Sequence, residues 1–147
     1  MTLTVNLDIC STFDWVSYEA ALKSMQDRKI DSKIIKWYKQ LLHSRTAYTE
    51  CNGVTRMIQV KRGTPQGSIL SPLIWSMVFE SFLKMFERGA ITAVGFADDC
   101  SLKITGIDPS TMVDKMNMAL NKARNWGIKF GLKFVPQKTT AIFLISS

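Results

Sequence analysis

Polar and apolar residues alternate strictly over residues 2–7, at the start of the chain. A period of two predicts a β-strand with one buried face, and this strand would end at Asp8. After a short connection, apolar residues recur at helical spacing over residues 15–25 and again over residues 34–42. This spacing predicts two amphipathic helices whose apolar stripes face a core.

The next segment has the pattern of a hairpin followed by a loop. Residues 45–60 are rich in Thr, Tyr and Val, and Cys51-Asn52-Gly53 in their middle is a turn signal. Residues 61–68 contain two glycines and a proline, which predicts a loop.

Residues 69–86 form the most apolar stretch of the chain. Its serines, Glu80 and Lys84 make it too polar to cross a bilayer, so we expect a buried helix and no membrane partner. Ser71 and Pro72 predict the start of this helix, with serine as its cap and proline in the first helical position.

A second hairpin is predicted further along the chain. Residues 91–96 and 101–105 are strand-like. The residues between them, Ala97-Asp98-Asp99-Cys100, are few enough to form a tight turn.

The last part of the chain predicts one helix and two short strands. Apolar residues recur at helical spacing over residues 112–123, Thr111 and Asp114 resemble a capping pair, and Gly131 suits a helix end. The two strands are expected at residues 132–134 and 141–145. With no internal repeat or linker, the order of elements favours one α+β domain over residues 1–147.

Composition agrees with a globular domain and excludes several classes. The 147 residues are 46% hydrophobic and 21% charged, which excludes disorder and collagen-like repeats, and the length excludes a two-domain enzyme. The net charge of +7 favours a polyanionic partner.

Three cysteines without metal-ligand spacing argue against a disulfide framework or a zinc site. No targeting segment precedes the first strand, so we expect an intracellular protein, in either nucleus or cytoplasm.

Three carboxylates stand out against this basic background. If the second hairpin pairs beside the first strand, Asp8, Asp98 and Asp99 meet at one end of the sheet. Carboxylates held together repel one another unless cations neutralise them. Oxygen ligands favour hard cations such as Mg²⁺, and two ions roughly 4 Å apart can promote phosphoryl displacement. Two ordinary alternatives stay open, because Asp-Asp pairs occur in hairpin turns and Asp8 could cap a helix.

Read together, four segments resemble successive motifs of the reverse transcriptase palm, in the order of that family. They are LDICSTFD at 7–14, RGTPQGSILSPL at 62–73, GFADD at 95–99 and GLKFVPQKT at 131–139. The similarity is strongest to enzymes of non-LTR retrotransposons. It implies an α+β polymerase palm, a ferredoxin-like or RRM-like antiparallel sheet with helices packed on one face. It also implies that fingers and thumb are largely missing.

The resemblance assigns a metal-binding role to the carboxylates. Asp8, Asp98 and Asp99 match the catalytic ligands of two Mg²⁺ ions, for which Mn²⁺ could substitute, and the backbone carbonyl of Ile9 matches a further ligand. Lys138 matches a lysine that acts as a general acid for the departing pyrophosphate, either as proton donor or as fixed positive charge. A solvated surface lysine is the alternative for Lys138.

Two further features of the motifs match nucleotide and template contacts. Phe13 matches the aromatic gate beneath the incoming sugar, which excludes a 2′-hydroxyl; a core phenylalanine is the alternative. Gln66 could contact the template base or the nucleotide, because its amide both donates and accepts, and Asp14 suits a helix cap or support for the site. The loop expected against template or nucleotide consists of Arg62, Gly63, Thr64, Pro65, Gln66 and Gly67.

The implied function is RNA-directed DNA polymerisation by a retroelement protein. The partners would be an RNA template, a DNA primer and a dNTP, which is transferred onto the primer 3′-hydroxyl. Because the chain starts near the first motif and stops soon after the fourth, we expect a truncated product with little unaided activity and a tendency to self-associate.

Two other classes of function remain as hypotheses. One is a decayed, non-catalytic RNA-binding module derived from the same fold, against which the acidic hairpin tip argues. The other is a carboxylate-metal phosphohydrolase, for which the Thr-Pro-Gln-Gly segment and Phe13 would have no purpose.

Overall fold

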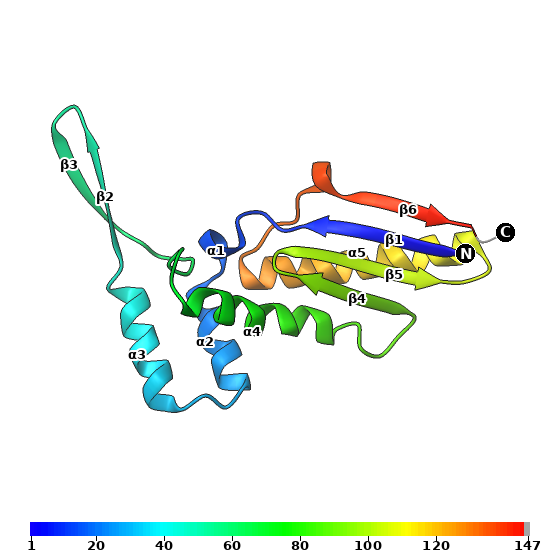
Figure 1. The fold of residues 1–147 in the computed structure, drawn as a ribbon, viewed down its shortest axis with the longest axis horizontal. Helices are drawn as coiled ribbons and strands as arrows, with labels where there is room; N and C mark the ends of the chain where they lie inside the picture. The colour runs from blue at the N-terminus through cyan, green and yellow to red at the C-terminus, as the bar shows by residue number, and fades with distance from the viewer. Residues whose placement is uncertain (146–147) are drawn as a thin grey trace.

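The centre of the molecule is a four-stranded antiparallel sheet. The computed structural model describes residues 1–145, and its sheet contains β1 (Thr2–Asp8), β4 (Ile91–Phe96), β5 (Asp99–Thr105) and β6 (Thr140–Leu144). The order across the sheet is β4-β5-β1-β6, so the first strand of the chain lies in its interior (Figure 1). The alternation predicted for this strand is confirmed, because Leu3, Val5 and Leu7 are buried and the residues between them are not.

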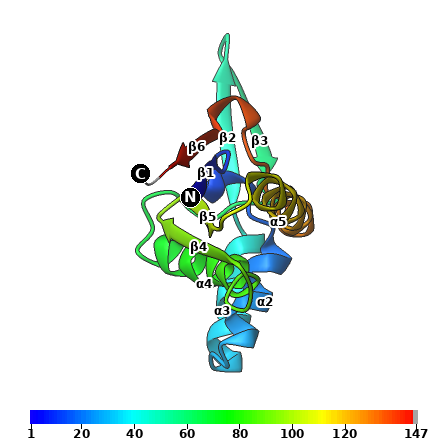
Figure 2. The same ribbon diagram turned by 90° about the vertical axis from the view of Figure 1, so that its right-hand side faces the viewer.

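Two long helices, α4 (Leu70–Lys84) and α5 (Pro109–Phe130), pack on one face of the sheet (Figure 2). Aromatic rings fill the space between them: the ring of Phe82, fully buried on α4, lies 5.1 Å from that of Trp126 on α5. The predicted α+β fold with helices on one face is therefore confirmed. Within residues 1–145, no helix has both the length and the apolar composition needed to cross a bilayer.

A second, smaller core lies beside α4. It is formed with α2 (Tyr18–Asp27) and α3 (Ser32–His43), whose Tyr38 and Leu42 are buried there. The hairpin of β2 (Thr46–Cys51) and β3 (Val54–Gln59) follows α3, as the sequence predicted. Among the described residues its strands pair only with each other, and they are exposed throughout and project away from the body (Figure 1).

The helix predicted over residues 15–25 is in fact two helices. α1 (Thr12–Trp15) is followed by Val16, whose backbone is extended, and α2 starts after Ser17. The hydroxyl of Ser17 accepts a hydrogen bond from the amide of Ala20 at 3.1 Å. A serine that satisfies a free amide in this way favours a new helix start over continuation.

Two predicted helix starts were wrong. α4 begins at Leu70, so Pro72 is its third residue, and the hydroxyl of Ser71 donates to the carbonyl of Pro65 at 2.6 Å instead of capping the helix. α5 is capped by Asp108, with Pro109 in the first position, and not by a Thr111 and Asp114 pair. In both cases a neighbouring polar contact decides where the backbone turns helical.

The predicted strand at residues 132–134 is reduced to one bridge. Phe134 pairs with Ile9, and a short 3-10 helix, η1 (Pro136–Lys138), follows before β6. The end of α5 at Gly131 is confirmed, since this glycine adopts a left-handed conformation with φ of 77°.

The three cysteines are free thiols, with Cys10 and Cys51 exposed and Cys100 buried in β5. Burial raises the pKa of the Cys100 thiol to about 12. The thiol of Cys100 therefore stays protonated and unreactive at neutral pH.

α4 approaches β4 so closely that one strand position must be glycine. A Cβ atom on Gly95 would fall 2.7 Å from Cζ of Phe79 and nearer still to Cε1 of the same ring. Phe79 is itself buried and stacks between Trp75 and Phe82, so its ring has no free space to move into.

We predict that Gly95→Ala lowers the free energy of unfolding by about 1–3 kcal/mol, because the added methyl group overpacks the Phe79 ring. Gly89→Ala is the matched control, since a Cβ there meets no atom within 4 Å. Urea unfolding of both variants measures the difference. Equal stabilities for the two variants would show that α4 does not press on Gly95.

A second prediction concerns the start of α5. The hydroxyl and amide of Thr111 and the hydroxyl of Ser110 donate to the Asp108 carboxylate and lower its pKa to about 2. Because the pKa of Asp108 is depressed, its contribution to stability is present above pH 4 and lost as the pH falls through about 2. We expect the difference in unfolding midpoint between the parent and Asp108→Asn to shrink over that range in urea titrations. A difference that stays constant down to pH 2 would contradict this expectation.

Candidate active site

The β1 and β5 strands bring two of the expected carboxylates directly opposite each other. Asp8 is the antiparallel partner of Asp99, at the end of β1 and the start of β5. Their neighbours Leu7 and Cys100 are buried against the helices, so Asp8 and Asp99 point to the open face of the sheet. Asp98 immediately precedes Asp99 in the turn between β4 and β5.

The turn of this hairpin is tighter than predicted. β5 begins at Asp99, which leaves only Ala97 and Asp98 between the strands, with Ala97 in a left-handed conformation at φ of 54°. The indole N–H of Trp75, from α4, donates to the carbonyl of Ala97 at 2.6 Å. Trp75 thus fixes the turn that carries Asp98, a role that the helical pattern around it did not indicate.

Lys138 reaches the same end of the sheet from the other side of β1. Its ammonium donates to Oδ2 of Asp8 at 3.1 Å. This hydrogen bond and the negative charge of Asp8 raise the pKa of Lys138 above its ordinary value. The lysine is therefore protonated at neutral pH and partly neutralises the carboxylate.

Backbone pairing fixes the segment that carries Lys138. The amide of Cys10 donates to the carbonyl of Lys133 at 2.8 Å, and the amide of Val135 donates to the carbonyl of Asp8 at 2.9 Å. These two hydrogen bonds are made by the residues on either side of Ile9, so the carbonyl of Ile9 takes no part in the pairing with residues 133–135. That carbonyl is consistent with the expected role as an additional oxygen ligand.

The donor set suits a hard divalent cation, but the side chains do not form a closed metal cage. Three carboxylates and a carbonyl supply only oxygen, the ligand that Mg²⁺ and Mn²⁺ prefer. Within residues 1–145, however, no group of three His, Cys, Asp or Glu side chains converges as metal ligands do. The carboxylates repel one another, and in this arrangement Asp8 pairs with Lys138 instead.

Gly63 in the 62–67 loop lies against α1 and not against open space. It has φ of 78°, and a Cβ there would lie 2.6 Å from the carbonyl oxygen of Asp14. The amide of Gly63 donates to Val16, and that of Thr64, a buried residue, donates to Phe13. Gly63 and Thr64 thus fasten the loop to the segment that follows Asp8.

The other half of the loop is free to meet a ligand. Gly67 also has a positive φ, of 77°, but a Cβ there would meet nothing within 4 Å. Gln66 is exposed, and its amide donates to the Asp14 carboxylate at 2.8 Å, which agrees with a supporting role for Asp14. Pro65, between these halves, accepts the hydroxyl of Ser71 and so ties the loop to α4.

Arg62 stacks on Trp15 at the end of α1. The guanidinium carbon lies 4.9 Å from the centre of the indole ring, and the ammonium of Lys133 lies 5.8 Å from the same ring. Such cation–π contacts hold both basic side chains beside the loop. Arg62 was expected in the loop, whereas the helical spacing of Trp15 suggested only a core position.

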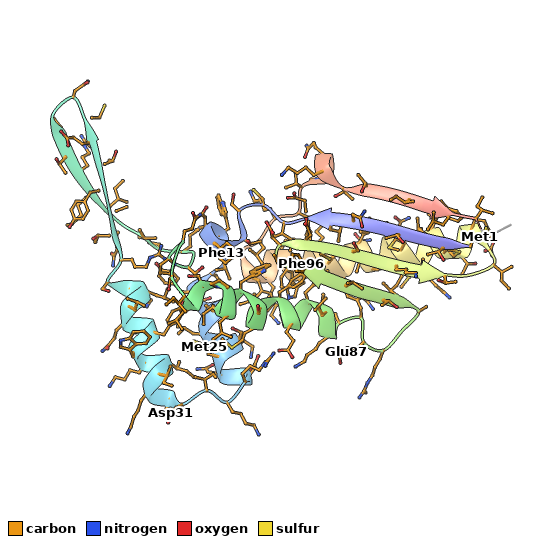
Figure 3. All side chains as sticks on the ribbon, viewed as in Figure 1. Met1, Phe13, Met25, Asp31, Glu87 and Phe96 are labelled. Carbon is orange, nitrogen blue, oxygen red and sulfur yellow. The ribbon has the colours of Figure 1, made fainter. Side chains whose placement is uncertain are left out.

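Two aromatic side chains lie toward the same end of the molecule as the carboxylates (Figure 3). Phe13, on α1, is half-buried and packs against the main core. Phe96 is 84% exposed, and it is the β4 partner of Asp99 on the open face. Side chains on the exposed face of a strand are usually polar, but β4 has Val94 and Phe96 there. These apolar residues were the feature of the sequence that could have identified Phe96.

Curated relatives of the chain are retrotransposon proteins. It is 25% identical over 138 residues to a protein described as "Putative 115 kDa protein in type-1 retrotransposable element R1DM" from Drosophila melanogaster. It is 26% identical over 143 residues to a "Retrovirus-related Pol polyprotein from type-1 retrotransposable element R1" from Bradysia coprophila. These alignments cover 94% and 95% of this chain but only 13% and 14% of the relatives, so the chain spans a small part of their length.

Solved structures of telomerase share the fold. Apo telomerase from Candida tropicalis superposes with a TM-score of 0.75 at 14% identity, over 96% of this chain and 28% of that one. Telomerase from Candida albicans, solved with a fragment of telomeric RNA, gives 0.72 at 14% identity, over 97% and 28%. At this identity the comparison establishes the fold alone.

A family model covers nearly the whole chain. The model described as "Reverse transcriptase (RNA-dependent DNA polymerase)" matches residues 1–143, which include all four motifs. The retrotransposon relatives agree with the expected non-LTR type. With its fold, motif order and family match in agreement, the chain belongs to the reverse transcriptase family.

Proposed function

We propose that this chain is the catalytic palm of an RNA-directed DNA polymerase from a retrotransposon. Asp8 pairs with Asp99 on the open face of the sheet, and Asp98 lies next to Asp99 in the turn; this arrangement is the main support for the proposal. Carboxylates gathered at the exposed end of a sheet suit a reaction that moves phosphate groups with the help of cations. The substrates would be a dNTP and the 3′-hydroxyl of a DNA primer annealed to an RNA template.

The side chains of Asp8, Asp98 and Asp99 and the carbonyl of Ile9 would hold two Mg²⁺ ions, or Mn²⁺ in their place. When bound, such ions lower the pKa of an attacking hydroxyl and neutralise the charge of the leaving phosphate oxygens. The protein would contribute the fixed positions of these oxygens, which the β1–β5 register and the bond from Trp75 to Ala97 define.

Lys138 would act beside the carboxylates. A lysine ammonium is charged at neutral pH, so it can stabilise negative charge on the departing pyrophosphate or donate a proton to it. Reaching the phosphate requires that its ammonium leave the Asp8 carboxylate. Cations bound at Asp8 would favour this exchange because they replace the positive charge of the lysine.

The loop and the aromatic side chains would position the nucleotide and the template. Gln66 offers an exposed amide beside the open space at Gly67, where a base can approach the backbone. Arg62, held against Trp15, would contact a template phosphate. Phe13 would contact the sugar of the incoming nucleotide and exclude a 2′-hydroxyl.

One observation favours a second function, a non-catalytic RNA-binding module. Asp8 is paired with the ammonium of Lys138, which supplies positive charge to this carboxylate from within the chain. A copy that no longer catalyses polymerisation could therefore keep its structure. Metal binding distinguishes the two functions, because only the polymerase requires it.

We predict that Asp98→Asn weakens the binding of Mn²⁺ by at least about tenfold, since the exchange removes a charged ligand. Isothermal titration calorimetry of the chain with primer-template and dNTP measures the change. Asp114→Asn on α5 is the matched control, because it removes one carboxylate without touching the site. Mn²⁺ binding that is absent in the folded parent, or equal in the parent and both variants, would favour the RNA-binding module.

We further predict that Phe13→Ala reduces discrimination between dUTP and UTP, which differ only in the 2′-hydroxyl, because removal of the ring opens space for this group. Competition between the two nucleotides for the chain, with Mn²⁺ and primer-template present, measures the ratio of their affinities. Phe134→Ala removes another half-buried aromatic ring and serves as the control. A ratio that changes equally in both variants would assign Phe13 to the core alone.

A further inference from the structure

α3 carries a concentration of positive charge outside the carboxylate site. Between Ser32 and His43 it contains Lys33, Lys36 and Lys39, and no Asp or Glu. Since the helix has no acidic residue of its own, its lysines repel one another unless a partner supplies negative charge.

Two of these lysines, Lys33 and Lys36, lie on the side of α3 that faces away from the body. Tyr38 and Leu42 are buried against α2 and α4, which fixes the inward side of the helix. At 100° per residue, the opposite side carries Lys33, Lys36, Trp37 and Gln40, all exposed. Figure 3 shows side chains that extend outward from α3 above the labelled Asp31.

These lysines lack partners within the part of the chain that the structure describes. Elsewhere on the helices, Lys23 pairs with Asp27 and Lys84 with Glu80. Within residues 1–145, none of the ion pairs includes a lysine of α3. The charge of this face is therefore available to an external polyanion.

A tryptophan lies among the lysines. Trp37 is 52% exposed, and within residues 1–145 the aromatic ring near it is that of Tyr38, tilted and 6.4 Å away. An exposed indole ring offers a flat apolar surface on which an unpaired base can stack, whereas the bases of a duplex are already stacked on each other. Lysines next to an exposed aromatic ring thus match a single strand better than a duplex or an acidic protein.

We propose that the outward face of α3, formed by Lys33, Lys36, Trp37 and Gln40, binds single-stranded RNA. Lys33 and Lys36 contact phosphates, and Trp37 stacks on a base. This site is separate from the carboxylates and does not depend on catalysis.

The position of α3 connects this face to the loop of the active site. The side-chain amide of Gln59, at the end of β3, donates to the carbonyl of His43 at 3.1 Å, and Arg45 donates to the carbonyl of Gly63 at 2.6 Å. α3, the root of the projecting hairpin and the 62–67 loop therefore form one continuous end of the molecule (Figure 1). RNA bound on α3 would lie at the same end of the molecule as Arg62.

The test is fluorescence anisotropy of the full chain with a labelled 20-nucleotide oligouridine, over a series of salt concentrations. For Lys33→Gln/Lys36→Gln we expect about tenfold weaker binding, and a decrease of about 1.4 in the slope of log affinity against log salt, because two phosphate contacts are lost. Lys115→Gln/Lys122→Gln removes the same charge from two exposed lysines of another helix, α5, and should leave both quantities unchanged. Equal losses in the two double variants, or no loss in the first, would overturn the proposal.

Trp37→Ala separates stacking from charge. We expect it to weaken binding of the oligouridine about fivefold or more with an unchanged salt slope, and to leave binding of an RNA duplex unaffected. An equal loss on the duplex would overturn the assignment to single strands. Lys33→Gln/Lys36→Gln should bind Mn²⁺ as tightly as the parent, so loss of metal binding and loss of the α3 site are distinguishable outcomes.

Discussion

The register between β1 and β5 is the constraint on which the rest of this structure depends. It sets Asp8 opposite Asp99 and, in the same ladder, turns Leu7 and Cys100 toward α4 and α5. Since side chains alternate between the two faces of a strand, a slip of one residue would bury the carboxylates and expose the core. The hydrophobic core and the acidic site are therefore fixed by one set of backbone hydrogen bonds.

The segment that follows β1 joins the remaining parts of the site to this sheet. Phe13 and Val16 accept backbone bonds from Thr64 and Gly63, and the amide of Ser17 donates to the carbonyl of Phe130 at 3.2 Å. The 62–67 loop and the end of α5, which are far apart in sequence, are thus both held by residues 13–17. This arrangement explains why Gly63 has no room for a side chain, whereas Gly67 is open to its surroundings.

Charge balance links the site to the chemistry proposed for it. Three carboxylates on adjacent backbone positions are unfavourable unless positive charge is near, and here Lys138 supplies it to Asp8. The same ammonium is available to a phosphate once cations occupy the carboxylates. Three further lysines lie on α3, and none of them forms an ion pair within residues 1–145.

The local sequence pattern was sufficient to predict most helices and strands and the identity of the chemical groups, although not the break between α1 and α2 or the start of α4. Alternation in residues 2–7 and helical spacing in α3 and α5 follow from burial of one face, which is a local pattern, and the motif residues marked the carboxylates in advance. Tertiary structure decided what depends on distant partners. The bond from Trp75 to Ala97, the stacking of Arg62 on Trp15 and the start of α4 all arise from contacts that no local pattern encodes. The close approach of Phe79 to Gly95 likewise exists only after α4 packs on the sheet.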